Sequence, residues 1–124
     1  MTWEPGRSYT RVQIHEALGG SKQSFLPRKN SVVVAACLRP NLNPDAPRVM
    51  LPGRGVEKQR AADWLSTNPK HEIPVFLKRD VNKWEYVGRY RCEKWTADPD
   101  EIRKFKPADR HDPIYRVLFL ARIE

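Results

Sequence analysis

The segment Trp84-Glu-Tyr-Val-Gly-Arg-Tyr-Arg-Cys92 decides the fold, because it is rich in the aromatic residues that favour β-strands. It follows residues 72–78, in which apolar side chains alternate, and Asp80-Val-Asn-Lys83 forms a turn-like link between the two runs. We therefore expect a β-hairpin. Alternate side chains of a regular strand share one face of the sheet. One face is predicted to carry Trp84, Tyr86, Gly88 and Tyr90, and the other Glu85, Val87, Arg89 and Arg91.

Other apolar runs predict the remaining strands. Ser31-Val-Val-Val-Ala-Ala-Cys-Leu38 is a β-branched run between turn-forming residues, and it predicts a buried central strand. A short strand is expected at residues 49–51, inside the proline-rich stretch 39–52. Residues 114–120 are apolar and predict a strand that closes the fold.

Capping signals and apolar spacing predict three short helices. Thr10 and Gln13 form a capping box, and Gly19-Gly20 ends the helix that it begins. Residues 56–65 are strong helix formers. Asp98-Pro99 has the N-cap and first-turn residues of a third helix, which we expect over residues 97–105.

The order of these elements indicates an α+β fold. We expect a curled β-sheet or half-open barrel of four to six strands, with two or three short helices packed outside. The chain has 124 residues, which is the size of one typical domain, so a single domain over residues 1–124 is predicted.

The charge of the chain favours a polyanionic partner. Lys and Arg number 23 against 15 Asp and Glu, which gives a formal charge of +8, and the sequence pI is about 9.8. Basic domains of this kind gain affinity for nucleic acid by releasing condensed counterions. The alternative is a merely soluble surface, because charges of about 2 to 8 are ordinary for small domains.

The cysteines and the lengths of the apolar runs indicate the cellular compartment in which the protein is expected. Cys37 and Cys92 each lie in a strand-like run, far apart in sequence, and are predicted to be buried thiols. The N-terminus does not resemble a signal peptide, and no apolar stretch approaches the roughly 20 residues needed to span a bilayer. We therefore expect a cytoplasmic protein without membrane contact.

Catalytic and metal-binding motifs are not found in the sequence. The histidines His15, His71 and His111 are not adjacent to a nucleophile in a known pattern, and His111-Asp112 precedes a proline as turn residues do. The sequence offers no HExxH or CxxC spacing. The expectation is a protein that is not an enzyme and has no metal or other cofactor.

The segment Gly53-Arg-Gly55 precedes the predicted helix at residues 56–65. Free backbone amides and a helix N-terminus at this position favour an anion, so the segment is a candidate phosphate contact. It lacks the full P-loop or dinucleotide-binding pattern. A plain tight turn is the alternative.

Basic and aromatic residues alternate in three parts of the chain. This pattern is typical of nucleic-acid binding, since bases stack on aromatic rings while guanidinium groups take phosphates. The alternative is that Trp84 and Tyr86 are core aromatics. The candidates are Arg7, Tyr9 and Arg11; Arg54, Lys58 and Arg60; and Trp84, Tyr86, Arg89, Tyr90 and Arg91.

Two runs in fixed order resemble those of PUA-like domains. They are Tyr9-Thr-Arg-Val-Gln-Ile-His-Glu-Ala-Leu-Gly-Gly-Ser-Lys-Gln23 and Trp84-Glu-Tyr-Val-Gly-Arg-Tyr90. The resemblance is to the SRA-like and EVE-like branches, which are often fused to HNH restriction nucleases. In these branches the leading helix ends in Gly-Gly-x-x-Gln and a late strand reads W-x-Y-x-G-x-Y. The resemblance implies a curled barrel that reads modified DNA, in SRA-type members by flipping a base into an aromatic pocket.

The resemblance also implies contact residues. It points to Gly19, Gly20 and Gln23 in the first loop, and to Trp84, Tyr86 and Tyr90 on the late strand. Lys22, in the same loop, is a further candidate contact with nucleic acid. Between them lie Arg54, Lys58, Gln59 and Arg60. Relatives often have a Gly-Asp-rich turn here, where this chain has Gly-Arg-Gly.

Three functional hypotheses follow. The leading one is a DNA-binding specificity module that recognises modified bases, as part of a modification-dependent restriction system and fused to or partnered with a nuclease. The second is an RNA-binding PUA-like module. The third is a small ASCH-like hydrolase of modified nucleosides, in which Lys58, Tyr86 and a carboxylate such as Glu57 or Asp63 assist the attack.

Overall fold

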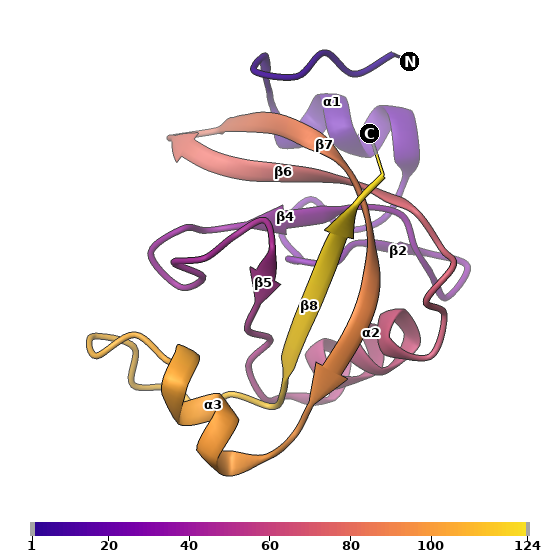
Figure 1. Cartoon of the computed structure of the whole chain (residues 1–124). Helices are drawn as coiled ribbons and strands as arrows, with labels where there is room; N and C mark the ends of the chain where they lie inside the picture. Colours follow the sequence, from indigo (N-terminus) through magenta and orange to yellow (C-terminus); the bar gives the residue numbers. More distant parts are fainter. Residues whose placement is uncertain (1, 124) are drawn as a thin grey trace.

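A computed structural model describes residues 2–123, in which three helices surround a curled β-sheet (Figure 1). The elements follow one another as β1 (Ser8–Tyr9), α1 (Arg11–Leu18), β2 (Arg28–Lys29), β3 (Val32–Val33), β4 (Ala36–Leu38), β5 (Val49–Met50), α2 (Val56–Ser66), β6 (Ile73–Asp80), β7 (Lys83–Thr96), α3 (Pro99–Phe105) and β8 (Val117–Arg122).

The main sheet is mixed and open. Its six strands include the path β4-β6-β7-β8-β5, and β1 pairs with the edge of β7 that β8 leaves free. The β4–β6 pair is parallel and the other pairs are antiparallel. β2 and β3 form a separate small sheet. The predicted α+β class is thus confirmed, and within residues 2–123 the sheet does not close into a barrel.

The predicted hairpin is present as β6 and β7, but its side chains do not keep one alternation. Phe76 pairs with Tyr86 while Val75 pairs with Gly88, so a bulge at this point adds one residue to β7. An added residue inverts the alternation of the strand. The expectation that Trp84, Tyr86, Gly88 and Tyr90 share one face is therefore wrong. Gly88 and Tyr90 lie on the face opposite to Tyr86.

A second bulge lies further along β7. Cys92 pairs with Leu120, but Lys94 pairs with Phe119 and Trp95 with Leu118, so the alternation inverts again. Trp95 consequently shares a face with Cys92.

The predicted central strand at residues 31–38 is also corrected. It is divided into β3 and β4, and β4 is the terminal strand of the main sheet's path rather than a central one. The amide of Val34, which lies between β3 and β4, donates to the carbonyl of Pro27. The amide of Cys37, in β4, donates to the carbonyl of Phe25. The preceding loop thus lies beside this segment and covers its outer side. This explains why an edge strand is buried.

Two core clusters lie on opposite faces of the sheet. One includes Leu65 of α2 together with Val75, Tyr90 and Leu118. The other packs α1, through Ile14, against a set of aromatic and small side chains: Tyr9, Ala35, Cys37, Phe76, Trp84 and Tyr86. Figure 1 shows α1 near the top, next to the hairpin of β6 and β7, and α2 lower down, behind β7.

The helix termini follow the predicted chemistry. The hydroxyl of Thr10 accepts from the amide of Gln13 at 3.1 Å, and the Gln13 side chain accepts from the amide of Thr10 at 2.8 Å, which completes the capping box. Asp98 caps α3.

Cys37 and Cys92 are buried free thiols, as expected. Within residues 2–123 no helix has the length and apolar character to cross a bilayer.

Gly20 is predicted to be more sensitive to substitution than Gly6. Both have a φ near +80°, so alanine is strained at either site, by about 1–2 kcal/mol. A Cβ on Gly20 also lies 2.8 Å from Cβ of Pro27, whereas one on Gly6 meets nothing within 4 Å. We expect Gly20→Ala to lower the free energy of unfolding by about 1–3 kcal/mol more than Gly6→Ala, in urea denaturation. Equal losses in the free energy of unfolding for the two variants would show that the loop containing Pro27 can move away from the added Cβ at no energetic cost.

Candidate nucleic-acid interface

A cavity of about 300 Å³ opens between the loop after α1, the loop after β4 and the start of α2. This volume lies at the lower end of the range for small-ligand sites, roughly 300–1,000 Å³. Its apolar lining consists of Phe25, Cys37, Leu42, Leu51, Pro52, Gly53 and Trp84. Its polar lining consists of Arg11, Gln23, Arg39, Asn43, Lys58, Arg110 and Asp112.

Arg110 holds one wall of this cavity together. Its guanidinium is buried and donates to both carboxylate oxygens of Asp112, at 2.8 and 3.0 Å. It also donates to the carbonyls of Leu42 and Leu51, at 3.0 and 2.8 Å. Asn43 adds a further link, since its side chain accepts from the amide of Leu51 at 2.8 Å. Three loop segments are thereby fixed around one charged group.

The Arg11 guanidinium also lines the cavity, beside Trp84. It is 9% exposed, and one nitrogen donates to the carbonyls of Ser21 and Ser24, both at 2.9 Å. Its Cζ is 5.1 Å from the centre of the Trp84 ring, a cation–π distance. The Nε of Arg11 is buried and has no hydrogen-bond partner within residues 2–123. A buried donor left unpaired is a group that a ligand acceptor can satisfy.

Cys37 contributes a buried thiol to the cavity wall. Burial raises the pKa of this thiol to about 12, although the neighbouring Arg11 charge acts to lower it. Cys37 therefore contributes a neutral, weakly polar surface at physiological pH. The lining of the cavity is thus mixed, with neutral side chains such as Cys37 and Trp84 next to the cationic Arg11.

The basic surface extends beyond the cavity through two adjoining hollows. The first, of about 400 Å³, shares Arg11, Arg39 and Trp84 with the cavity and adds Lys22 and Lys78. The second, of about 310 Å³, shares Arg39 and Lys78 with the first. Within residues 2–123 neither Arg39 nor Lys58 forms an ion pair. Unpaired cations at the rim of a cavity favour an anionic ligand.

The structure brings together some of the residues predicted from the sequence. Those that line the cavity or its first adjoining hollow are Arg11, Lys22, Gln23, Lys58 and Trp84. Gln59 lies on the same helix as Lys58, and its side chain accepts from the amide of Gly55 at 3.1 Å. Arg60 lines a separate hollow and is 3.5 Å from Glu57.

Other candidates lie elsewhere. Tyr86 and Tyr90 are 6% and 5% exposed and belong to the two opposite core clusters, so they do not form the expected stacking face. Tyr9 is buried next to Tyr86, and Arg7 is exposed with its Cζ 5.5 Å from the Tyr9 ring. Arg89 forms an ion pair with Glu72, at 3.3 Å.

The two glycines of the first loop have a packing role. Gly19 ends α1, and a Cβ there would lie 2.8 Å from Cδ of Lys29. Gly20 packs against Pro27 in the same way. Both allow the loop to turn back toward β2, and this places the following Gln23 at the cavity.

The segment Gly53-Arg-Gly55 lies at the far end of the cavity. Gly53 is buried in the lining, and a Cβ there would lie 3.0 Å from Oδ2 of Asp112. Arg54 is exposed, and its Cζ is 5.7 Å from the centre of the Tyr115 ring. The tight turn thus brings backbone close to the cavity, while the amide of Gly55 is already bound to Gln59.

Sequence reasoning did not find several lining residues. Phe25 is a half-buried ring in the segment between the first helix and residue 31, for which no element is predicted, and Arg39 and Asn43 lie in the proline-rich stretch. From the sequence, Asp112 is interpreted as a turn residue. The nearby Arg110 is the sequence feature that could have indicated its role, because oppositely charged residues two apart in a loop can form an ion pair that holds a local turn.

Stability should depend on pH through Asp112. The hydrogen bonds from Arg110 lower the pKa of Asp112 below its usual 3.8, so the ionised carboxylate stabilises the fold above that pH and loses this contribution as the pH falls through the lowered pKa. We expect the melting temperature of Asp112→Asn to lie below that of the wild type at pH 7 and to converge with it toward pH 2.

Asp109→Asn, which removes the same charge from an exposed position three residues earlier, serves as the control and should track the wild type throughout. A deficit of Asp112→Asn that stays constant from pH 7 to pH 2 contradicts the proposed role of the carboxylate.

Comparison with known proteins gives a family and a fold. No curated protein matches the sequence. A solved structure titled "Structure of the Type IV phosphorothioation-dependent restriction endonuclease ScoMcrA" is similar over 98% of this chain, with a TM-score of 0.56 and 14% sequence identity. The chain spans 28% of that neighbour's length, and at this identity the similarity shows a shared fold. A family model matches residues 8–112, and the chain therefore belongs to the family described as a domain of unknown function, DUF6697.

Proposed function

We propose that this domain binds DNA and recognises a modified base, as the specificity module of a modification-dependent restriction system. The observation that carries the proposal is the cavity beside Trp84, which combines apolar side chains with the cations Arg11, Arg39 and Lys58 and holds an unpaired buried donor on Arg11. Support also comes from the shared fold with a protein whose title describes a phosphorothioation-dependent restriction endonuclease.

The cavity offers different groups to different parts of a nucleotide. Phe25 and the edge of Trp84 provide aromatic surface for a base that leaves its stack. Arg11 and Gln23 provide hydrogen-bonding groups for the base edge. The exposed rim cations Arg39 and Lys58 are suited to the phosphates on either side.

The Trp84 ring does not act as an open stacking platform in this proposal. Arg11 and Lys78 place their cationic groups 5.1 and 5.8 Å from its centre, and only 4% of the residue is exposed. The half-buried ring of Phe25 takes over the stacking role, and the Arg11 guanidinium remains available to the base edge.

Binding should fall steeply with salt and should depend on the rim cations. We expect Arg39→Gln to weaken duplex binding about tenfold and to reduce the slope of log affinity against log salt by about 1, the amount for one lost phosphate contact. Lys70→Gln removes an equal charge from an exposed position that does not line the cavity, and is the matched control. Fluorescence anisotropy across a salt series measures both quantities. Equal effects of the two variants contradict a localised interface.

Recognition of the modification should depend on the cavity rather than on charge. Duplexes of one sequence that carry no modification, 5-methylcytosine or a phosphorothioate linkage are compared, with the matching RNA as a competitor. We expect at least one modified duplex to bind more tightly than the plain one. Leu42→Phe, which enlarges a lining side chain, should abolish this preference and leave the weak, salt-dependent binding intact.

Each alternative outcome has a distinct reading. Equal binding of all duplexes reduces the function to non-specific DNA binding. Stronger binding of the RNA favours the RNA-binding module. Retention of the preference in Leu42→Phe, with the fold confirmed by circular dichroism, moves recognition out of the cavity.

A further inference from the structure

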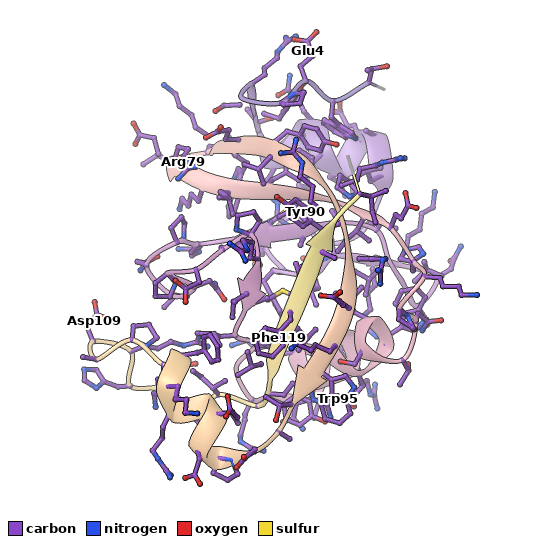
Figure 2. All side chains as sticks on the ribbon, in the orientation of Figure 1. Glu4, Arg79, Tyr90, Trp95, Asp109 and Phe119 are labelled. Atoms are coloured by element: carbon purple, nitrogen blue, oxygen red, sulfur yellow. The ribbon has the colours of Figure 1, made fainter. Side chains whose placement is uncertain are left out.

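Trp95 is an exposed aromatic side chain at the end of β7 opposite to Trp84. It keeps 45% of its surface exposed, and Figure 2 labels it near α2, away from Arg79 at the tip of the hairpin. The Cζ of Arg116 lies 4.0 Å from the centre of the Trp95 ring. At this distance the guanidinium lies over the face of the ring rather than beyond its edge.

The position of Arg116 is fixed on several sides. Its Cζ is also 4.4 Å from the centre of the Tyr115 ring, and one nitrogen donates to the Tyr115 hydroxyl at 2.9 Å. The same nitrogen is 3.1 Å from Oδ1 of Asp63, which accepts from the Tyr115 hydroxyl at 2.7 Å. Asp63 is thus compensated by Arg116, and Trp95 rests against a rigid support.

A chain of contacts joins this support to the cavity. Gly53 is in the cavity lining, and the adjacent Arg54 reaches over the Tyr115 ring. Arg54 is exposed and has no ion pair within residues 2–123. The surface formed by Arg54, Tyr115, Arg116 and Trp95, here called the Trp95 track, therefore begins where the cavity ends.

We propose that the Trp95 track binds unpaired nucleotides of the DNA strand that enters the cavity, with a base stacked on Trp95 and a phosphate held by Arg54. This inference rests on the proposed function, because it extends the same DNA site. Exposed aromatic rings bind bases of any sequence by stacking, and an unpaired cation next to them follows the backbone. The compensated Asp63 leaves the exposed part of the track positive.

The proposal predicts a contribution from single-stranded overhangs. A blunt duplex with the preferred modification is compared with the same duplex carrying four unpaired thymidines at its 5′ or its 3′ end, by fluorescence anisotropy. One of the two overhangs should raise the affinity of the wild type about five- to tenfold, as expected for one stacked base. Trp95→Ala should remove this gain, and Trp95→Phe should keep most of it.

Lys94→Ala is the matched control. Lys94 is adjacent on β7 but on the opposite face, where its Nζ lies 5.0 Å from the centre of the Phe119 ring. We expect this variant to lose a charge and to retain the gain from the overhang. A second measurement locates the contact directly. When 5-iodo-2′-deoxyuridine replaces a thymidine of the overhang, irradiation should crosslink it to the peptide that contains Trp95, as identified by mass spectrometry.

The outcomes separate the two proposals. A gain that survives in Trp95→Ala, or a crosslink that maps elsewhere, overturns the Trp95 track while leaving the cavity as the DNA site. Absence of a gain in the wild type, with normal binding of the blunt duplex, has the same consequence. Failure of the wild type to bind the blunt duplex overturns the proposed function. It also overturns the proposal for the Trp95 track, which rests on that function.

Discussion

The backbone pairing of β7 is the constraint on which the rest of the structure depends. Over 14 residues this strand pairs with β6 along one edge and with β1 and β8 in succession along the other. Two bulges turn its side chains over, first between Tyr86 and Gly88 and again after Cys92. A single strand thereby supplies aromatic side chains to both core clusters, and it sets Trp84 and Trp95 at opposite ends of the sheet.

The cavity depends on a second, more local interaction. The region between β4 and α2 has little regular structure, so its backbone groups need partners outside the sheet. Arg110 and Asn43 supply them, and they do so from inside the protein rather than from its surface. Buried charge is costly unless it is fully bonded, and here the bonds connect three loop segments. The result is a well-bonded part of the cavity wall, in a region of the chain where composition alone predicts only a loop.

Local chemistry made several elements predictable. The capping box at Thr10, the Asp98 cap and the tight turn that joins β6 to β7 all act over a few residues, and the structure has each of them in place. The errors arise where distant segments meet. The loop that covers β4 turns an apparent central strand into a buried edge, and pairing with β6 places the first bulge in β7. Gly88 was the local sign of that bulge, since glycine inside a strand often marks one.

Composition and short-range bonding were enough to predict the α+β class, the basic character of the domain and the positions of the helix caps at Thr10 and Asp98. Only the tertiary structure decided which predicted contact residues meet. Arg11, Gln23, Lys58 and Trp84 line one cavity, whereas Tyr86 and Tyr90 are buried in the core. The physical reason is that the face to which a strand residue points depends on register and bulges, which long-range pairing sets.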